Sequence, residues 1–234
     1  MYIDMCMIGG TYVYNQCCRR KIWGGGEQYV YDICKQLQQR HRTAYILVDQ
    51  SNEDMQSRYA QVGHVMTANL YTLKGFLSVN AVAKQMKGQR INTIVCHSGK
   101  YILFCIALKQ LTGAKLVFIK HNLVPGKTDM YHRWINAQVD AFVCVSKLVY
   151  DDLMTPAIKD TSKYHVVYNG IDPNRFQSFS DAVPMTYKVR TFGYSARITE
   201  RKGLYLILSA LEQIHQNKSR CSIDYIGGWY RRSN

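Results

Sequence analysis

Apolar runs rich in valine and isoleucine alternate along this chain with amphipathic segments. Strands that are buried on both faces read as continuous apolar runs, so the alternation predicts a doubly wound α/β fold in which helices cover both faces of a parallel sheet. Strands are expected within residues 2–8, 43–50, 91–98, 114–122, 140–146, 163–172, 187–198 and 221–228. Helices are expected after Gly26 and over residues 101–113, 147–154 and 200–214.

Three consecutive glycines, residues 24–26, end a long polar loop that is expected to follow the first strand. An apolar stripe at helical spacing comes directly after them, at Val30, Ile33, Cys34 and Leu37. Glycines at the start of a helix let an anionic oxygen approach the backbone N–H groups, where the helix dipole favours it. The loop therefore predicts a site for a phosphate or sugar oxygen, and a flexible turn remains the alternative.

In doubly wound sheets, ligands bind beyond the carboxyl ends of the strands. This rule selects polar residues that follow a predicted strand directly. They are the loop from Gly24 to Glu27, the pair His97 and Ser98, the pair His121 and Asn122, and the pair Asn169 and Gly170.

A change in pattern near residue 180 predicts two domains, 1–180 and 181–234, with the linker within residues 173–184. The second domain contains two expected strands and one helix. These elements are too few to close a hydrophobic core of their own.

The formal net charge of +14 is high for a chain of 234 residues. Such a chain attracts anions, among them nucleic acid, acidic lipid and phosphorylated small molecules, although a solvated basic surface is also compatible with this charge.

Eight cysteines occur, mostly inside apolar stretches and without a CxxC pair, which favours buried free thiols over metal ligands or disulfides. No apolar run is long enough to span a bilayer and the first residues do not read as a signal peptide. We therefore expect a cytoplasmic protein.

Three stretches resemble, in order and approximate spacing, the motifs of the family-four glycosyltransferases. They are GGGEQYVYDICKQLQQRHRTAYIL from residue 24, HVVYNGIDPNRF from residue 165 and FGYSARITERKGLYLILSAL from residue 192. The resemblance implies a retaining enzyme of the GT-B fold, with an acceptor-side and a donor-binding Rossmann-like domain facing each other across a cleft.

The resemblance also implies roles for cationic and glycine residues. Arg197 and Lys202 match the basic pair that binds the diphosphate of a nucleotide-sugar donor, and Gly25 and Gly26 match the loop that approaches donor phosphate or acceptor. Fixed cations stabilise the negative charge that grows on a departing nucleoside diphosphate. Without the family, Arg197 and Lys202 read as ordinary surface cations near a helix start.

His121 matches a histidine near the donor sugar and is the predicted catalytic residue. Glu27, His97 and Asn122 are the predicted acceptor-binding or sugar-binding residues. Structural roles are the alternatives, because a lone histidine is often structural and Glu27 suits the first turn of a helix.

A hinge between the domains is expected at Asn169, Gly170 and Asp172, since asparagine and glycine tolerate the backbone angles of a tight turn.

Two departures from the family pattern stand out. Ala196 replaces the usual glycine before Arg197, and the chain stops at Asn234, before the family's glutamate pair that holds the donor sugar and ribose. We therefore expect a chain truncated within the donor-binding domain, which binds donor poorly alone.

The combined prediction is a hexosyltransferase that moves a sugar, with retention, from a nucleotide sugar to a polysaccharide or cell-envelope acceptor. No metal or other cofactor is expected. Predicted partners are the nucleotide sugar and a glycan or lipid-linked acceptor. An anionic membrane surface, at which the protein would be peripheral, and a second copy or companion subunit are further candidates.

Two alternatives remain open at this point. One is a non-catalytic binding or partner subunit of a glycosyltransferase. The other is a basic nucleic-acid-binding protein, which the net charge of +14 and the 18 tyrosines suggest. The basic residues are scattered without a nucleic-acid motif, so nucleic acid is not the expected partner.

Overall fold

The computed structural model describes residues 11–15, 23–69, 74–154, 158, 160–171, 190–194, 196, 202–216 and 221–225. The chain divides into two compact units, Met1–Ile171 and Asp172–Asn234, which we treat separately as the first and second units. The predicted domain boundary after residue 180 lies outside the described residues and stays a prediction.

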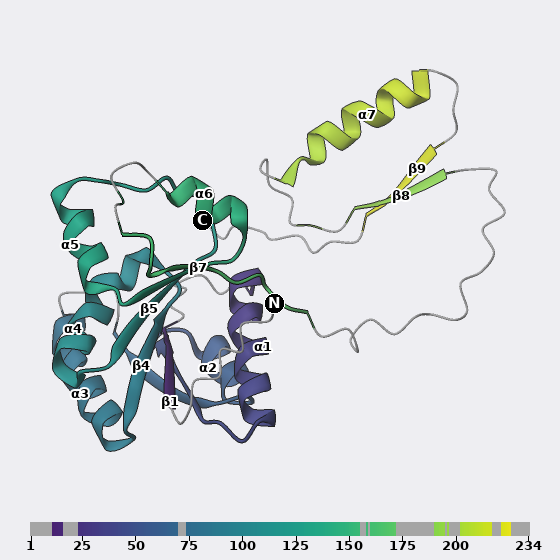
Figure 1. Cartoon of the computed structure of the whole chain (residues 1–234). Coiled ribbons are helices and arrows are strands. Elements are labelled where there is room, and N and C mark those ends of the chain that lie inside the picture. Colours follow the sequence, from purple (N-terminus) through teal and green to yellow (C-terminus); the bar gives the residue numbers. More distant parts are fainter. Residues whose placement is uncertain are drawn as a thin grey trace. The chain divides into compact units, whose positions relative to one another are not determined.

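In the described part of the first unit, seven parallel strands form one sheet, in the order β3-β2-β1-β4-β5-β6-β7 (Figure 1). The strands are β1 (Thr11–Asn15), β2 (Ala44–Asp49), β3 (His64–Ala68), β4 (Ile91–Cys96), β5 (Lys115–Lys120), β6 (Ala141–Cys144) and β7 (Tyr164–Val166). The order reverses between β1 and β4, which makes that point the switch point of a Rossmann-like fold, where ligands bind. The predicted fold class is confirmed.

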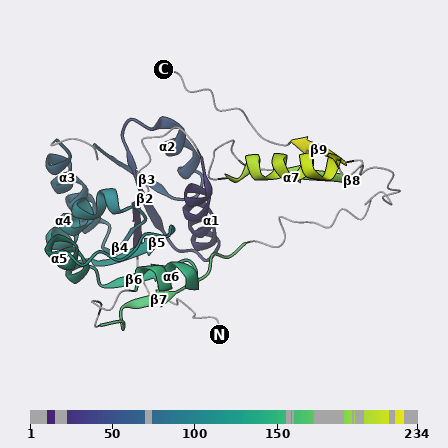
Figure 2. The same ribbon diagram turned by 90° about the horizontal axis from the view of Figure 1, so that it is seen from above.

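Helices cover both faces of this sheet. They are α1 (Gly25–Gln39), α2 (Glu53–Tyr59), α3 (Lys74–Gly88), α4 (Ile102–Thr112), α5 (Met130–Gln138) and α6 (Lys147–Leu153), with a short 3₁₀ helix at Gly99–Tyr101. Figure 2 shows α1 on one side of the sheet and α3 and α4 on the other.

Two hydrophobic cores result, one on each face. Because neighbouring strand residues point to opposite faces, Ile94 packs with α3 and α4 while Val95 packs with α1 and α2. Val30 and Cys34, on the predicted apolar stripe of α1, are fully buried.

The local signals at helix ends act as expected. Gly113 ends α4 with a positive φ of 73°, a conformation that glycine adopts without strain. Ser146 precedes α6, and its hydroxyl accepts a hydrogen bond of 3.2 Å from the N–H of Val149.

The first of the described strands lies where no strand was predicted. β1 lies at Thr11–Asn15, which the sequence analysis assigned to a polar loop, and that assignment was wrong. Its sequence, TYVYN, contains one aliphatic residue and so lacks the continuous apolar run that reveals a buried strand. The strand expected within residues 2–8 lies outside the described residues. Sequence analysis also overlooked α2, β3, α3 and α5.

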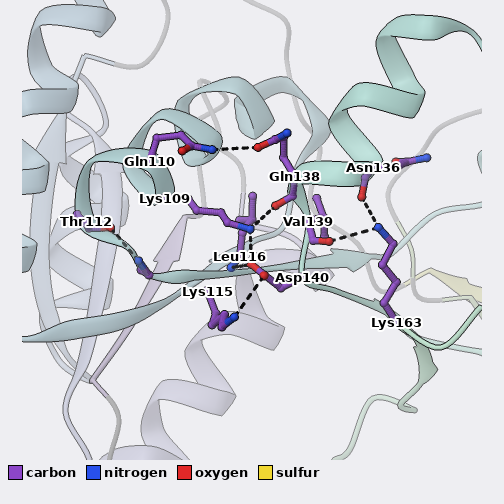
Figure 3. A network of polar contacts seen from close by, with 11 residues as sticks. Lys109, Gln110, Thr112, Lys115, Leu116, Asn136, Gln138, Val139, Asp140 and Lys163 are labelled. Atoms are coloured by element: carbon purple, nitrogen blue, oxygen red, sulfur yellow. Dashed lines mark hydrogen bonds and ion pairs between the residues drawn. The ribbon is translucent and has the colours of Figure 1, made fainter. Parts of the chain in front are cut away.

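A polar network fastens the amino-terminal ends of β5, β6 and β7 (Figure 3). Asp140 accepts hydrogen bonds from Lys109 Nζ at 2.6 Å and from the N–H of Leu116 at 2.7 Å. Lys109 also donates to the carbonyl of Gln138, and Lys163 donates to the carbonyls of Asn136 and Val139. We call these residues the amino-edge network.

The second unit contains β8 (Arg190–Tyr194), α7 (Leu204–Gln216) and β9 (Cys221–Tyr225), as the sequence predicts. The two strands pair in parallel, and the hydroxyl of Tyr194 donates to the carbonyl of Lys202 at 3.1 Å.

Four cysteines with described side chains, Cys34, Cys96, Cys105 and Cys144, are free and buried, which confirms the prediction for these four. Among the described residues, no helix combines the length and apolar character that crossing a bilayer requires.

Candidate functional site

Two histidines meet at the carboxyl ends of neighbouring strands. His97 follows β4 and His121 follows β5, and both lie two residues beyond a strand residue packed with α1. His97 Nδ1 and His121 Nε2 are 3.0 Å apart, and the ring centroids are 5.3 Å apart with the planes 22° from parallel. The predicted sugar-binding residue and the predicted catalytic residue are thus in direct contact.

Tyr29, in the first turns of α1, packs its ring against both histidines. Its ring centroid lies 5.2 Å from that of His121 and 5.9 Å from that of His97, edge to face in both cases. Such geometry is the preferred one for aromatic pairs. Sequence reasoning missed Tyr29, although its place one turn after the glycines puts it near the same strand ends.

Glu27 brings a negative charge to this site. It is 8% exposed, and it is the third residue of α1. Its carboxylate acts electrostatically on His121. We call Glu27, Tyr29, His97 and His121 the histidine cluster.

Burial keeps the histidines uncharged. Loss of solvent, and next the proximity of His121, lower the pKa of His97 to about 3. Burial also lowers the pKa of His121, against the opposing effect of Glu27. At neutral pH each ring is therefore a neutral imidazole, with one N–H donor and one acceptor nitrogen.

The glycines at the start of α1 have different surroundings. A Cβ on Gly24 would lie 3.0 Å from Glu27 Oε2, so a side chain there would press on that carboxylate. A Cβ on Gly25 would meet no described atom within 4 Å. Packing therefore accounts for Gly24, whereas Gly25 is exposed and leaves space in front of the backbone N–H groups of the first turn.

Contacts of Tyr59 and Trp23, which we call the aromatic brace, hold the first turn of α1 in place. The hydroxyl of Tyr59, in α2, donates to the carbonyl of Glu27 at 3.1 Å, and the ring of Trp23 lies 5.5 Å from that of Tyr59. Trp23 Nε1 donates to Gln28 Oε1 at 2.8 Å, and the guanidinium of Arg58 lies 4.9 Å from the Trp23 ring. The brace fixes the position of Glu27 relative to the sheet.

The remaining predicted site residues are more scattered. Asn122 is exposed directly after His121, and Asn169 and Gly170 are exposed after β7. Lys202 is exposed in the second unit. Arg197 and Asp172 lie outside the described residues. The binding of the donor diphosphate by Arg197 and Lys202 and the hinge between the domains stay predictions.

Metal ligands do not cluster among the described residues: no group of three or more histidine, cysteine, aspartate or glutamate side chains could hold an ion there. Independence from metal remains a prediction.

Solved structures share this fold. A glycosyltransferase from Rickettsia africae has a TM-score of 0.73 at 16% identity, with 93% of this chain and 68% of that protein covered. HepE of Anabaena, in complex with UDP and glucose, has a TM-score of 0.66 at 17% identity, with 92% and 60% covered. The lipopolysaccharide outer core galactosyltransferase WaaB has a TM-score of 0.63 at 12% identity, with 93% and 61% covered.

This chain thus spans between 60% and 68% of the length of these three proteins. No curated protein matches its sequence. The family model described as Glycosyltransferase Family 4 matches residues 23–175, a range that includes α1, the histidine cluster and β7. The protein belongs to glycosyltransferase family 4.

Proposed function

We propose that this protein transfers a hexose, with retention of configuration, from a nucleotide sugar to a polysaccharide or cell-envelope acceptor. One observation carries the proposal. In a family-four chain, the histidine cluster lies beside the glycine start of α1, at the strand ends where doubly wound folds bind ligands. HepE, which has this fold, was solved with UDP-glucose.

The glycine start of α1 would bind the donor. Gly25 leaves the first-turn N–H groups open to a phosphate or hydroxyl oxygen, and the positive end of the helix favours a negatively charged one. We assign Arg197 and Lys202 to the leaving diphosphate, where fixed cations stabilise the growing negative charge.

The histidine cluster suits the sugar. Glycosyl transfer proceeds through a centre with oxocarbenium character, so positive charge develops on the sugar ring. A protonated histidine would oppose that charge, whereas neutral His121 with the carboxylate of Glu27 nearby does not. His121 can therefore hydrogen-bond a sugar hydroxyl without an electrostatic penalty in the transition state.

Binding of the donor tests the proposal. We expect UDP and UDP-hexoses to raise the melting temperature of the purified chain, and His121→Ala to reduce that rise. His64→Ala is the matched control, because His64 stacks on Tyr45 at the other end of the sheet. Because the chain is expected to bind donor weakly, the ligands are added at millimolar concentration, and no stabilisation by any nucleoside diphosphate or nucleotide sugar under these conditions would contradict the proposal.

The acceptor and the membrane belong to the same proposal. The net charge of +14 favours an anionic surface, so we propose that the protein works peripherally at a membrane that carries its acceptor. Sedimentation with vesicles that contain anionic lipid checks this, with neutral vesicles as the control. Tight, salt-sensitive binding of single-stranded RNA or DNA would point instead to the nucleic-acid alternative.

A further inference from the structure

His97 differs from His121 in how it is held. Its Nε2 is shielded from solvent, and the backbone beside it is anchored because the carbonyl of Ser98 accepts hydrogen bonds from Cys96 Sγ at 3.3 Å and from the N–H of Tyr101 at 3.1 Å. One ring nitrogen of His97 faces His121 and the other is buried, so neither nitrogen is placed to bond a substrate. We propose that His97 is a positioning residue that holds the ring of His121 in one tautomer and one orientation.

The facing nitrogens couple the two rings. A hydrogen bond between His97 Nδ1 and His121 Nε2, at 3.0 Å, needs one N–H and one lone pair. A proton on Nδ1 of His97 therefore requires a bare Nε2 on His121, and the reverse also holds. Because a neutral imidazole carries one proton, the state of Nε2 also decides the state of His121 Nδ1. The pair therefore has two combined states, of which the fixed surroundings of His97 select one.

Packing prevents the rings from rotating out of this hydrogen bond. Tyr29 contacts the faces or edges of both histidines at centroid distances of 5.2 and 5.9 Å. Rotation of His121 would break the bond to His97 and the contact with Tyr29 together. Two constraints on one ring define a fixed direction for its remaining nitrogen.

Burial preserves the bond over the physiological pH range. If both rings were protonated, two N–H groups would face each other and the bond would be lost. The pKa of His97, at about 3, excludes that state at neutral pH. His97 thus acts as a permanently neutral partner.

The consequence for activity rests on the function proposed above. A sugar hydroxyl that meets His121 would find the same donor or acceptor in every molecule. Without His97, part of the population would present the wrong nitrogen, which lowers kcat more than it changes KM.

Nitrogen NMR of the histidine-labelled protein tests the proposal without any need for activity. We expect His121 in a single tautomer and a scalar coupling between His97 Nδ1 and His121 Nε2. In His97→Phe we expect a mixture of tautomers at His121, whereas His97→Asn, whose amide can replace Nδ1, should restore one form. His64→Phe should leave His121 unchanged.

Absence of the coupling in the wild-type protein, or a single unchanged tautomer in a folded His97→Phe variant, would overturn the proposal. The wild-type measurement decides the matter even if that variant does not fold. If the chain transfers sugar, His97→Phe should lower kcat about tenfold or more with little change in KM, and His97→Asn should recover most of the loss. An inactive chain with the expected NMR result would count against the proposed function alone.

Discussion

Buried polar groups are charged at one end of the parallel sheet and neutral at the other. At the amino end, Lys109 and Asp140 stay charged and pair at 2.6 Å. At the carboxyl end, His97 and His121 lose their charge through burial and bond as neutral rings. The first arrangement fastens three strands and a helix end, while the second leaves a neutral, rigid pair of histidines next to an open helix start. The contrast separates stability from ligand binding within one fold.

Asp140 illustrates the stabilising end. Burial alone would raise the pKa of its carboxyl, but the N–H of Leu116 and the ammonium of Lys109 hold that pKa below its usual value. The charged form is thus favoured in the folded protein.

Among the substitutions, Asp140→Ala has the largest expected effect on stability. The substitution removes the partner of Lys109 and Leu116, and we expect it to lower the free energy of unfolding by about 2 kcal/mol, allowing for partial exposure. Urea denaturation measures this loss. UDP binding by the folded fraction should not change. Asp151→Ala, which removes an exposed pair with Lys147, is the control and should have no measurable effect.

Acidification tests the other end of the sheet, where it should act selectively on His97 and His121. Unfolded histidines bind protons below a pKa of about 6.5, whereas folded His97 does not until about pH 3. The unfolded state therefore takes up more protons, and the free energy of unfolding falls as the pH drops from 6.5, by up to about 1.4 kcal/mol per pH unit for each such histidine.

The contribution of Asp140 behaves differently, because its lowered pKa preserves the ion pair until the pH falls below about 4. Urea denaturation between pH 4 and 6.5 therefore reports on histidines. His97→Asn should reduce the proton uptake on unfolding by about one. An unchanged pH dependence in that variant would show that His97 is not the buried neutral group inferred here.

Gly25→Ala should separate stability from binding at the carboxyl end. Because a Cβ there meets no described atom, alanine should preserve stability or raise it by up to about 1 kcal/mol. The methyl group would stand before the first-turn N–H groups, so we expect UDP affinity to fall about tenfold, or about 1.4 kcal/mol. Calorimetric titration measures the affinity. Equal binding by both forms would remove the helix start from the donor site.

The smallest expected effect is that of Tyr59→Phe, which removes only the hydroxyl that holds the Glu27 carbonyl. We expect a loss of about 1 kcal/mol in the free energy of unfolding and a weaker response to UDP. Gln61→Ala is a useful comparison, because it removes an exposed hydrogen bond. The hydroxyl of Tyr31, in α1, donates this bond to the side-chain oxygen of Gln61 at 3.4 Å. A stable Tyr59→Phe with normal binding would mean that the brace is not needed.

Sequence reasoning worked where the information is local or periodic. The apolar runs of β2, β4, β5 and β6 identified the sheet, and the rule about carboxyl ends brought His97 and His121 to one edge although 24 residues separate them. It failed for β1, whose TYVYN resembles a polar segment. α2 was overlooked despite a clear signal, since Asn52 caps it and Glu53 and Asp54 follow.

Other features had no local signal. The bond between Tyr59 and Glu27 joins residues 32 positions apart on two helices, and only packing decides it. The depressed pKa of His97 similarly depends on burial and on a neighbour from another strand. Such properties follow from the tertiary arrangement and not from the composition of any one segment.

The place of β1 in the sheet affects how the protein is made. Tyr12 pairs with Ala44 on one side and with Thr93 on the other, so β1, the first of the described strands, completes its hydrogen bonds only after β4 has left the ribosome. Until then one edge of β1 remains open, and distant pairings of this kind fold slowly and expose surfaces that aggregate. Synthesis at reduced speed or with chaperones should therefore favour recovery of this protein.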